Sequence, residues 1–158
     1  APATTAEPAP PPPAPPPPPP PPPQPDPVAQ LASSPSGATL ELTNAERAAA
    51  GLAPLEWSST LADAAAAHSA DQASRNTMSH TGSDGTNGGT RIARAGFAAR
   101  AWGENVAAGY DSAPSVLAGW MDSPGHRENV LGASFTHIGV AYAEASDGTW
   151  YWTMVLAA

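Results

Sequence analysis

Proline is distributed very unevenly along this chain, and the distribution confines where a compact domain can form. Of the 21 prolines in 158 residues, 18 lie within the first 35 residues, including an unbroken run from Pro15 to Pro23. Proline fixes φ and lacks an amide hydrogen, so such a stretch favours polyproline II, which has no internal hydrogen bonds. We therefore expect residues 1–38 to be a disordered, semi-rigid spacer and residues 39–158 to form one domain.

Charge and cysteine content exclude several classes of function for the expected domain. From residue 39 onward the chain carries six arginines, no lysine and twelve acidic residues, a net charge of −6. Binding to nucleic acid requires a cationic surface, so we expect no nucleic-acid partner. The chain has no cysteine, which excludes a disulfide framework and a thiolate metal site. It also has no apolar run approaching the ~18 residues of a transmembrane segment.

The first residues suggest export. The chain begins Ala1-Pro2-Ala3 without an initiator methionine, and small residues are typical around signal-peptide cleavage sites. We expect a mature protein whose signal peptide has been removed, secreted or cell-wall associated; a trimmed longer chain is the alternative. Because no repeat or heptad argues for an oligomer, we expect a monomer.

Hydrophobic spacing predicts helices in the first half of the domain. A first helix is expected from Leu40 to Ala50, with Thr43 or Asn44 as its cap. A second is expected from a cap at Ser58 to about Asn76. His68 falls on or beside its apolar stripe, and we interpret it as a core or rim histidine with a hydrogen-bonded partner rather than a metal ligand.

The rest of the chain predicts a loop, two further helices and a hairpin. Residues 77–90 are rich in turn formers, and functional side chains concentrate on such loops. Helices are expected near 91–95 and over 112–122. The alternating segment 135–143 and the strand formers of 150–156 flank a turn and predict a β-hairpin. Helices first and strands last indicate an α+β fold with a mainly antiparallel sheet. Short strands in the middle of the chain would be missed when elements are predicted from hydrophobic spacing.

A stretch around a Ser-Pro-Gly step contains the densest set of polar side chains. Ser123 suits a helix N-cap and Pro124 the first helical position, which would hold His126 at the start of a helix. A Ser-His hydrolase with Ser123 or Ser79 as nucleophile is the rival interpretation. No Gly-x-Ser-x-Gly elbow surrounds either serine, which argues against it.

Three ionisable residues are candidates for a site: His80 in the loop, Glu104 between Gly103 and Asn105, and His126. Two converging imidazoles suit a divalent cation, for which Zn²⁺ is the commonest choice. A carboxylate nearby would either orient one ring or act as general base on a metal-bound water. Sequence spacing alone does not bring these residues together, and Glu104 could equally be structural.

Seven short motifs occur in one order along the chain. They are Asn44-x-x-Arg47, Gly51-Leu52-x-Pro54-Leu55-x-Trp57, Leu61-Ala62-x-x-Ala65, Ser79-His80, Gly103-Glu104-Asn105, Trp120-Met121-x-Ser123-Pro124-Gly125-His126-Arg127, and Gly139-Val140 followed by Trp150-Tyr151-Trp152-Thr153. With them, the chain from about Thr39 resembles the CAP superfamily (cysteine-rich secretory proteins, antigen 5, pathogenesis-related 1), in its Cys-free bacterial SCP-like branch.

The resemblance implies a three-layer α-β-α sandwich with a central cleft lined by two histidines and two acids. By position, His80 and His126 match the histidines, which bind a divalent cation in some relatives, and Glu104 matches the first acid. The second acid of animal and plant members falls at Ser123, with Asp122 just before it. The fourth member is therefore absent or displaced.

Two functions follow from this comparison. The first is a secreted binding module whose cleft holds a divalent cation, such as Zn²⁺, near His80 and His126. The same cleft would bind a lipid, glycan, peptide or cell-wall component. The second is a metal-dependent, peptidase-like hydrolase with Glu104 as general base. Two histidines are fewer than the three protein ligands typical of catalytic zinc, which favours the binding module.

Overall fold

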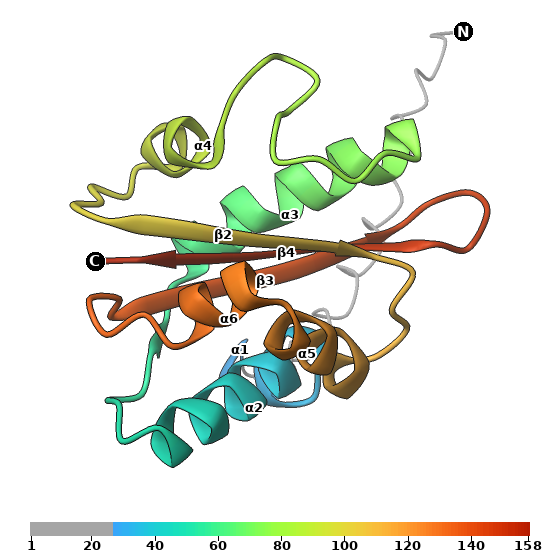
Figure 1. The fold of residues 1–158 in the computed structure, drawn as a ribbon. Coiled ribbons are helices and arrows are strands. Elements are labelled where there is room, and N and C mark those ends of the chain that lie inside the picture. The colour runs from blue at the N-terminus through green and yellow to red at the C-terminus, as the bar shows by residue number, and fades with distance from the viewer. Residues whose placement is uncertain (1–26) are drawn as a thin grey trace, which may run out of the picture.

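The computed structural model describes residues 27–158, which form helices around one sheet (Figure 1). The elements follow in the order α1 (Pro27–Ala32), α2 (Pro35–Ala49), β1 (Glu56–Trp57), α3 (Ser59–Arg75), α4 (Gly88–Ala95), β2 (Trp102–Ala108), α5 (Ala113–Asp122), α6 (Pro124–Val130), β3 (His137–Glu144) and β4 (Trp150–Ala157). Helices dominate the first part and the two longest strands end the chain.

The sheet has the strand order β1-β3-β4-β2. β3 and β4 pair antiparallel as a hairpin, and β2 pairs antiparallel with β4 on its other side. Only the short β1 runs parallel to its neighbour, β3. The expected hairpin and the mainly antiparallel sheet are therefore confirmed.

Helices cover both faces of this sheet, which gives three layers (Figure 1). α3 and α4 lie on one face, while α2, α5 and α6 lie on the other. α3 packs very closely on β3, because a Cβ at Gly139 would overlap the backbone of Leu61 and Ala62. On the opposite face, Trp120 and Trp152 are fully buried in the larger hydrophobic core. The α+β, α-β-α architecture is confirmed.

The start of the folded part differs from the expectation. α2 begins at Pro35 rather than Leu40, because Ser34 caps it by accepting the amide of Gly37 and Pro35 takes the first helical position. Thr43 is therefore buried inside the helix, and Asn44 bonds both backbone polar groups of Leu55. Residues 27–38, expected within the spacer, are mostly helical. The proline run lies outside the described residues.

The middle of the chain holds one element that the sequence did not predict. Residues 102–108, for which the sequence predicted no element, form β2, and α4 begins at Gly88 rather than Arg91. By contrast α3, with caps at Ser58 and Asn76, and α5 match their expected bounds closely. Ser123 occupies the cap position of α6, but its side chain makes no cap hydrogen bond.

Candidate functional site

Glu104 is a buried carboxylate on β2, with a side chain only 2% exposed. One oxygen, Oε1, lies 2.9 Å from Nδ1 of His80, and the other, Oε2, accepts a 2.6 Å hydrogen bond from Nη2 of Arg91. Arg91 comes from α4 and is itself largely buried, at 11% side-chain exposure. The carboxylate therefore joins the loop histidine to a helix arginine.

These contacts set the protonation of the cluster. The Glu104 hydrogen bond raises the pKa of His80 above its ordinary value, against a smaller opposing effect of burial. Burial alone would raise the pKa of Glu104, but the hydrogen bonds from His80 and Arg91 outweigh it and lower that pKa. Glu104 is therefore ionised at neutral pH. Because a carboxylate only accepts, Nδ1 of His80 carries the proton that Glu104 accepts.

The backbone on either side of His80 is held by buried side chains. Nε2 of His68 lies 2.7 Å from the carbonyl oxygen of Ser79, and Gln72 accepts the Ser79 amide over 3.1 Å. Arg91 also donates to the carbonyl oxygen of His80 over 3.0 Å. His68 is thus a buried, hydrogen-bonded core histidine, as predicted.

His126 enters the site from α6, on the other side of β2. Asn105 donates to the carbonyl oxygen of His126 over 3.0 Å, and Asn129 of the same helix donates to Asn105 over 2.8 Å. Burial lowers the pKa of His126, and the charge of His80 lowers it further. His126 therefore favours its neutral form.

His126 also lines a pocket of about 320 Å³ beside β2. Its walls include Met78 from the loop, Tyr110, and Trp120 and Ser123 at the end of α5. Met78 is half exposed at this rim, so apolar surface is open to solvent here. A mainly apolar hollow therefore leads to one of the two histidines.

Asp122 and Ser123 are placed differently with respect to this pocket. Asp122 is exposed at the end of α5 and is not among the pocket residues. Ser123 is half-buried and lines the pocket together with His126. The position of the second acid therefore carries a hydroxyl, and the adjacent carboxylate is not part of the pocket lining.

The donor set fits an open, weakly held cation rather than a closed site. The histidines offer neutral imidazole nitrogens, and Glu104 orients the ring of His80 as supporting carboxylates do in metal sites. Among residues 27–158, no group of three or more His, Asp or Glu side chains could hold a metal ion. Any cation at His80 and His126 would take its remaining ligands from water or from a bound molecule.

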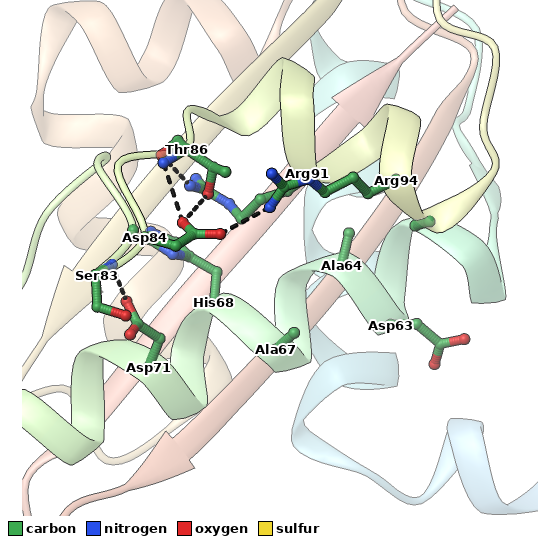
Figure 2. A pocket seen from close by; sticks show the side chains of 12 residues that line it. Asp63, Ala64, Ala67, His68, Asp71, Ser83, Asp84, Thr86, Arg91 and Arg94 are labelled. Atoms are coloured by element: carbon green, nitrogen blue, oxygen red, sulfur yellow. Dashed lines mark hydrogen bonds and ion pairs between the residues drawn. The ribbon is translucent and has the colours of Figure 1, made fainter.

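A second pocket, of about 430 Å³, lies between α3, the 82–86 loop and α4 (Figure 2). Asp84 lies among its lining residues. It accepts hydrogen bonds from the amide and hydroxyl of Thr86 and forms a 2.7 Å ion pair with Arg94. Arg91 lines this pocket and also reaches Glu104. His80 and His126 do not line it, so it is separate from the histidine site.

Comparison with known proteins decides the family. Residues 40–156 match the cysteine-rich secretory protein family, CAP. The chain belongs to this family. The uncharacterized protein YkwD of Bacillus subtilis is 39% identical over 108 residues, which are 68% of this chain and 42% of YkwD. The chain thus spans less than half the length of this relative.

Solved structures agree with this CAP assignment. An extracellular SCP-domain protein of Bacillus anthracis matches with a TM-score of 0.71 at 32% identity, covering 78% of this chain and 40% of that one. An outer surface protein of Borrelia burgdorferi, 22% identical, matches with a TM-score of 0.70 over 75% of this chain and 87% of its own, which supports the fold alone.

Two contributors to this CAP site were missed in the sequence. Arg91 was assigned only to a short helix, and nothing in its spacing pointed to Glu104, 13 residues away on a strand that was not predicted. Asn129 lies two residues after the Pro-Gly-His-Arg stretch but was not considered as a support of β2, where it bonds Asn105. A polar residue next to a predicted site histidine is the signal that could have found it.

Proposed function

We propose that this CAP domain is a secreted binding module in which His80 and His126 hold a divalent cation, most simply Zn²⁺, beside a ligand-binding pocket. The apolar walls next to His126 suit a lipid, or the apolar faces of a glycan, peptide or cell-wall component. We treat the protein as a monomer in this proposal.

The two imidazoles differ in how readily they would bind a cation, because the raised pKa of His80 favours its protonated ring whereas His126 favours its neutral form. A metal needs the neutral ring, and the pKa of His126 is lowered by burial and by His80. His80 keeps its proton on Nδ1 through Glu104, which leaves Nε2 as the nitrogen that would bind a cation. When bound, the cation would supply Lewis acidity and an anchoring point for an oxygen of the ligand.

The single observation that favours binding over catalysis is that Glu104 is engaged through both carboxylate oxygens. Oε1 contacts His80 and Oε2 contacts Arg91, and these contacts lower its pKa. A general base works best with a pKa near the working pH and with access to the proton it removes. Glu104 is better suited to hold the two side chains in place, which makes the metal-dependent hydrolase the weaker alternative.

The proposed location outside the cell is supported by one relative. The Bacillus anthracis SCP-domain protein, 32% identical to this chain, is described as extracellular. Within residues 27–158, no helix combines the length and apolar character needed to cross a bilayer.

The proposal is tested by titrating the full chain with Zn²⁺ in a calorimeter, alongside His80→Ala, His126→Ala and the double variant. We expect one site in the wild type, weakened at least about tenfold in each single variant. Affinity should fall as the pH drops through the raised pKa of His80, above its ordinary value of 6.5, because protons then compete for the imidazoles. A wild type that binds no more Zn²⁺ than the double variant would contradict the proposal.

The two functions are separated by adding a chelator to a ligand-binding and a hydrolysis screen of cell-wall and lipid fractions. If the protein is a binding module, we expect no hydrolysis of any fraction, with or without the chelator. Metal-dependent turnover that Glu104→Gln abolishes would establish the hydrolase instead.

A further inference from the structure

The residue before His80 is fixed at both of its backbone polar groups by α3. His68 is 1% exposed, and its Nε2 lies 2.7 Å from the Ser79 carbonyl oxygen. Gln72, one helical turn further along and fully buried, accepts the Ser79 amide over 3.1 Å. In Figure 2, the side chain of His68 rises from α3 toward the loop. Neither side chain belongs to the histidine site itself.

Gln72 is in turn anchored to the sheet. Its Nε2 donates to the hydroxyl of Thr153 on β4 over 3.1 Å, and Ser69 donates to the same hydroxyl over 2.9 Å. Both ends of the buried amide are therefore paired, as burial of a polar group requires. The loop backbone before His80 is thereby connected to the central sheet through one side chain.

His68 stays in the core at a cost. A carbonyl only accepts, so Nε2 carries the proton, and Nδ1 is then a buried acceptor for which residues 27–158 offer no hydrogen-bond partner. Leaving such a group unpaired destabilises the fold, and leucine in the same place would avoid this cost. The bond to Ser79 is the contact that offsets this cost, which points to a role in placing the loop.

We propose that His68 and Gln72 are positioning residues, which set the ring of His80 against Glu104 by holding the peptide groups of Ser79. The inference rests on the proposed function only in taking His80 as a metal ligand. The placement of the ring is a separate matter, and it can be measured without metal.

The test uses two substitutions at each of the two residues, one that removes the hydrogen-bonding group and one that keeps it. His68→Leu removes the donor to Ser79, while His68→Gln retains an amide donor. Gln72→Met removes the acceptor, while Gln72→Glu retains one. Ser69→Ala is the matched control, because Ser69 is equally buried and also bonds Thr153 but makes no bond to Ser79. Thermal unfolding identifies variants that are folded at the working temperature.

Two readouts are taken on each folded variant. In metal-free protein, we expect the Ser79 amide to exchange faster in His68→Leu and Gln72→Met, and the His80 ring nitrogen signals to move toward those of Glu104→Ala. Zn²⁺ affinity should fall about tenfold in the same two variants and recover largely in His68→Gln and Gln72→Glu. Ser69→Ala should lose stability without changing either readout.

The outcomes separate the two proposals. If His68→Leu and Gln72→Met leave the His80 ring signals and Ser79 exchange as in the wild type, the positioning role is wrong, whatever the metal result. If the ring signals move but the wild type binds no Zn²⁺, the positioning role stands and the proposed cation site fails. An equal effect of Ser69→Ala on the His80 signals would also overturn the positioning role.

Discussion

Glu104 owes its chemical character to two partners from different parts of the chain, His80 and Arg91. It is buried on β2, where an isolated carboxylate would be protonated, yet Arg91 and His80 stabilise its charge. Removing the partner of either carboxylate oxygen would leave part of the negative charge of Glu104 unpaired, although its side chain is only 2% exposed. The residue therefore serves first to organise its neighbours, and this is why we assign it an orienting role.

The His80–Glu104 contact predicts a defined pH dependence of stability. The pKa of His80 is raised by folding, so its contribution is fully present below its ordinary value of 6.5 and is lost as pH rises through the raised value. The pKa of Glu104 is lowered, so its contribution is present above 4.5 and is lost as pH falls through the lowered value. The pair should therefore stabilise most between these two ordinary values.

The measurement compares two proteins that both carry His126→Gln, one with His80 intact and one with His80→Gln, by urea unfolding across this range. Because the pKa of His126 is lowered, its effect has the opposite sign, so both proteins carry His126→Gln. We expect the difference in unfolding free energy to be largest near about pH 5.5 and to shrink in alkaline solution. If the difference in unfolding free energy instead grows as the pH rises, the charge of protonated His80 does not stabilise its contact with Glu104.

The neighbouring positions 122 and 123 give a second prediction at this scale. Ser123 lines the pocket with His126, whereas Asp122 is exposed and outside it. Ser123→Glu should therefore place a carboxylate near the imidazoles and strengthen Zn²⁺ binding by about tenfold, while Asp122→Asn leaves affinity unchanged. Calorimetric titration of the two variants checks this. Weakened binding in Asp122→Asn would mean that Asp122 replaces the second acid after all.

At the scale of elements, α3 serves the fold and the site at once. One part of it packs on β3 at Gly139, where the helix backbone occupies the space of a side chain. Further along, His68 and Gln72 hold the loop that carries His80. The distance of α3 from the sheet therefore also sets the position of the loop.

This packing predicts that one added methyl group at Gly139 lowers the unfolding free energy strongly. Gly139→Ala would force α3 away from β3, and we expect a loss of about 3 kcal/mol in unfolding free energy, at the upper end for overpacking. Gly125→Ala is the control, because a Cβ there meets nothing within 4 Å and alanine favours the helix α6. Urea unfolding measures both. A Gly139→Ala variant as stable as the control would refute the close contact.

Elements with a clear hydrophobic period were predictable, and β2 was not. α3 and α5 show apolar residues at helical spacing, and the β3–β4 hairpin shows alternation around a turn. β2 contains Gly103, Glu104 and Asn105 at positions that are buried in the structure. Buried polar residues conceal a strand, because their partners on α4 and α6 cannot be read from the local sequence.

At the scale of the whole molecule, the site is assembled where the two helical layers meet the edge of the sheet. Arg91 comes from one layer and His126 from the other, with Glu104 on the edge strand between them. The sequence singled out three candidate residues, His80, Glu104 and His126, by their surroundings, and the family resemblance matched each of them by position. It could not supply Arg91, or the contacts of His68 and Gln72, because those depend on how α3 and α4 lie over the sheet.

The account depends on one arrangement, in which His80 binds a cation through Nε2 while Nδ1 remains hydrogen-bonded to Glu104. Long-range ¹H–¹⁵N spectra of the histidine rings, recorded with and without Zn²⁺, test it directly. We expect Zn²⁺ to shift Nε2 of His80 and one ring nitrogen of His126, with His80 still protonated at Nδ1. Unchanged rings, or Zn²⁺ on Nδ1 of His80, would contradict the account.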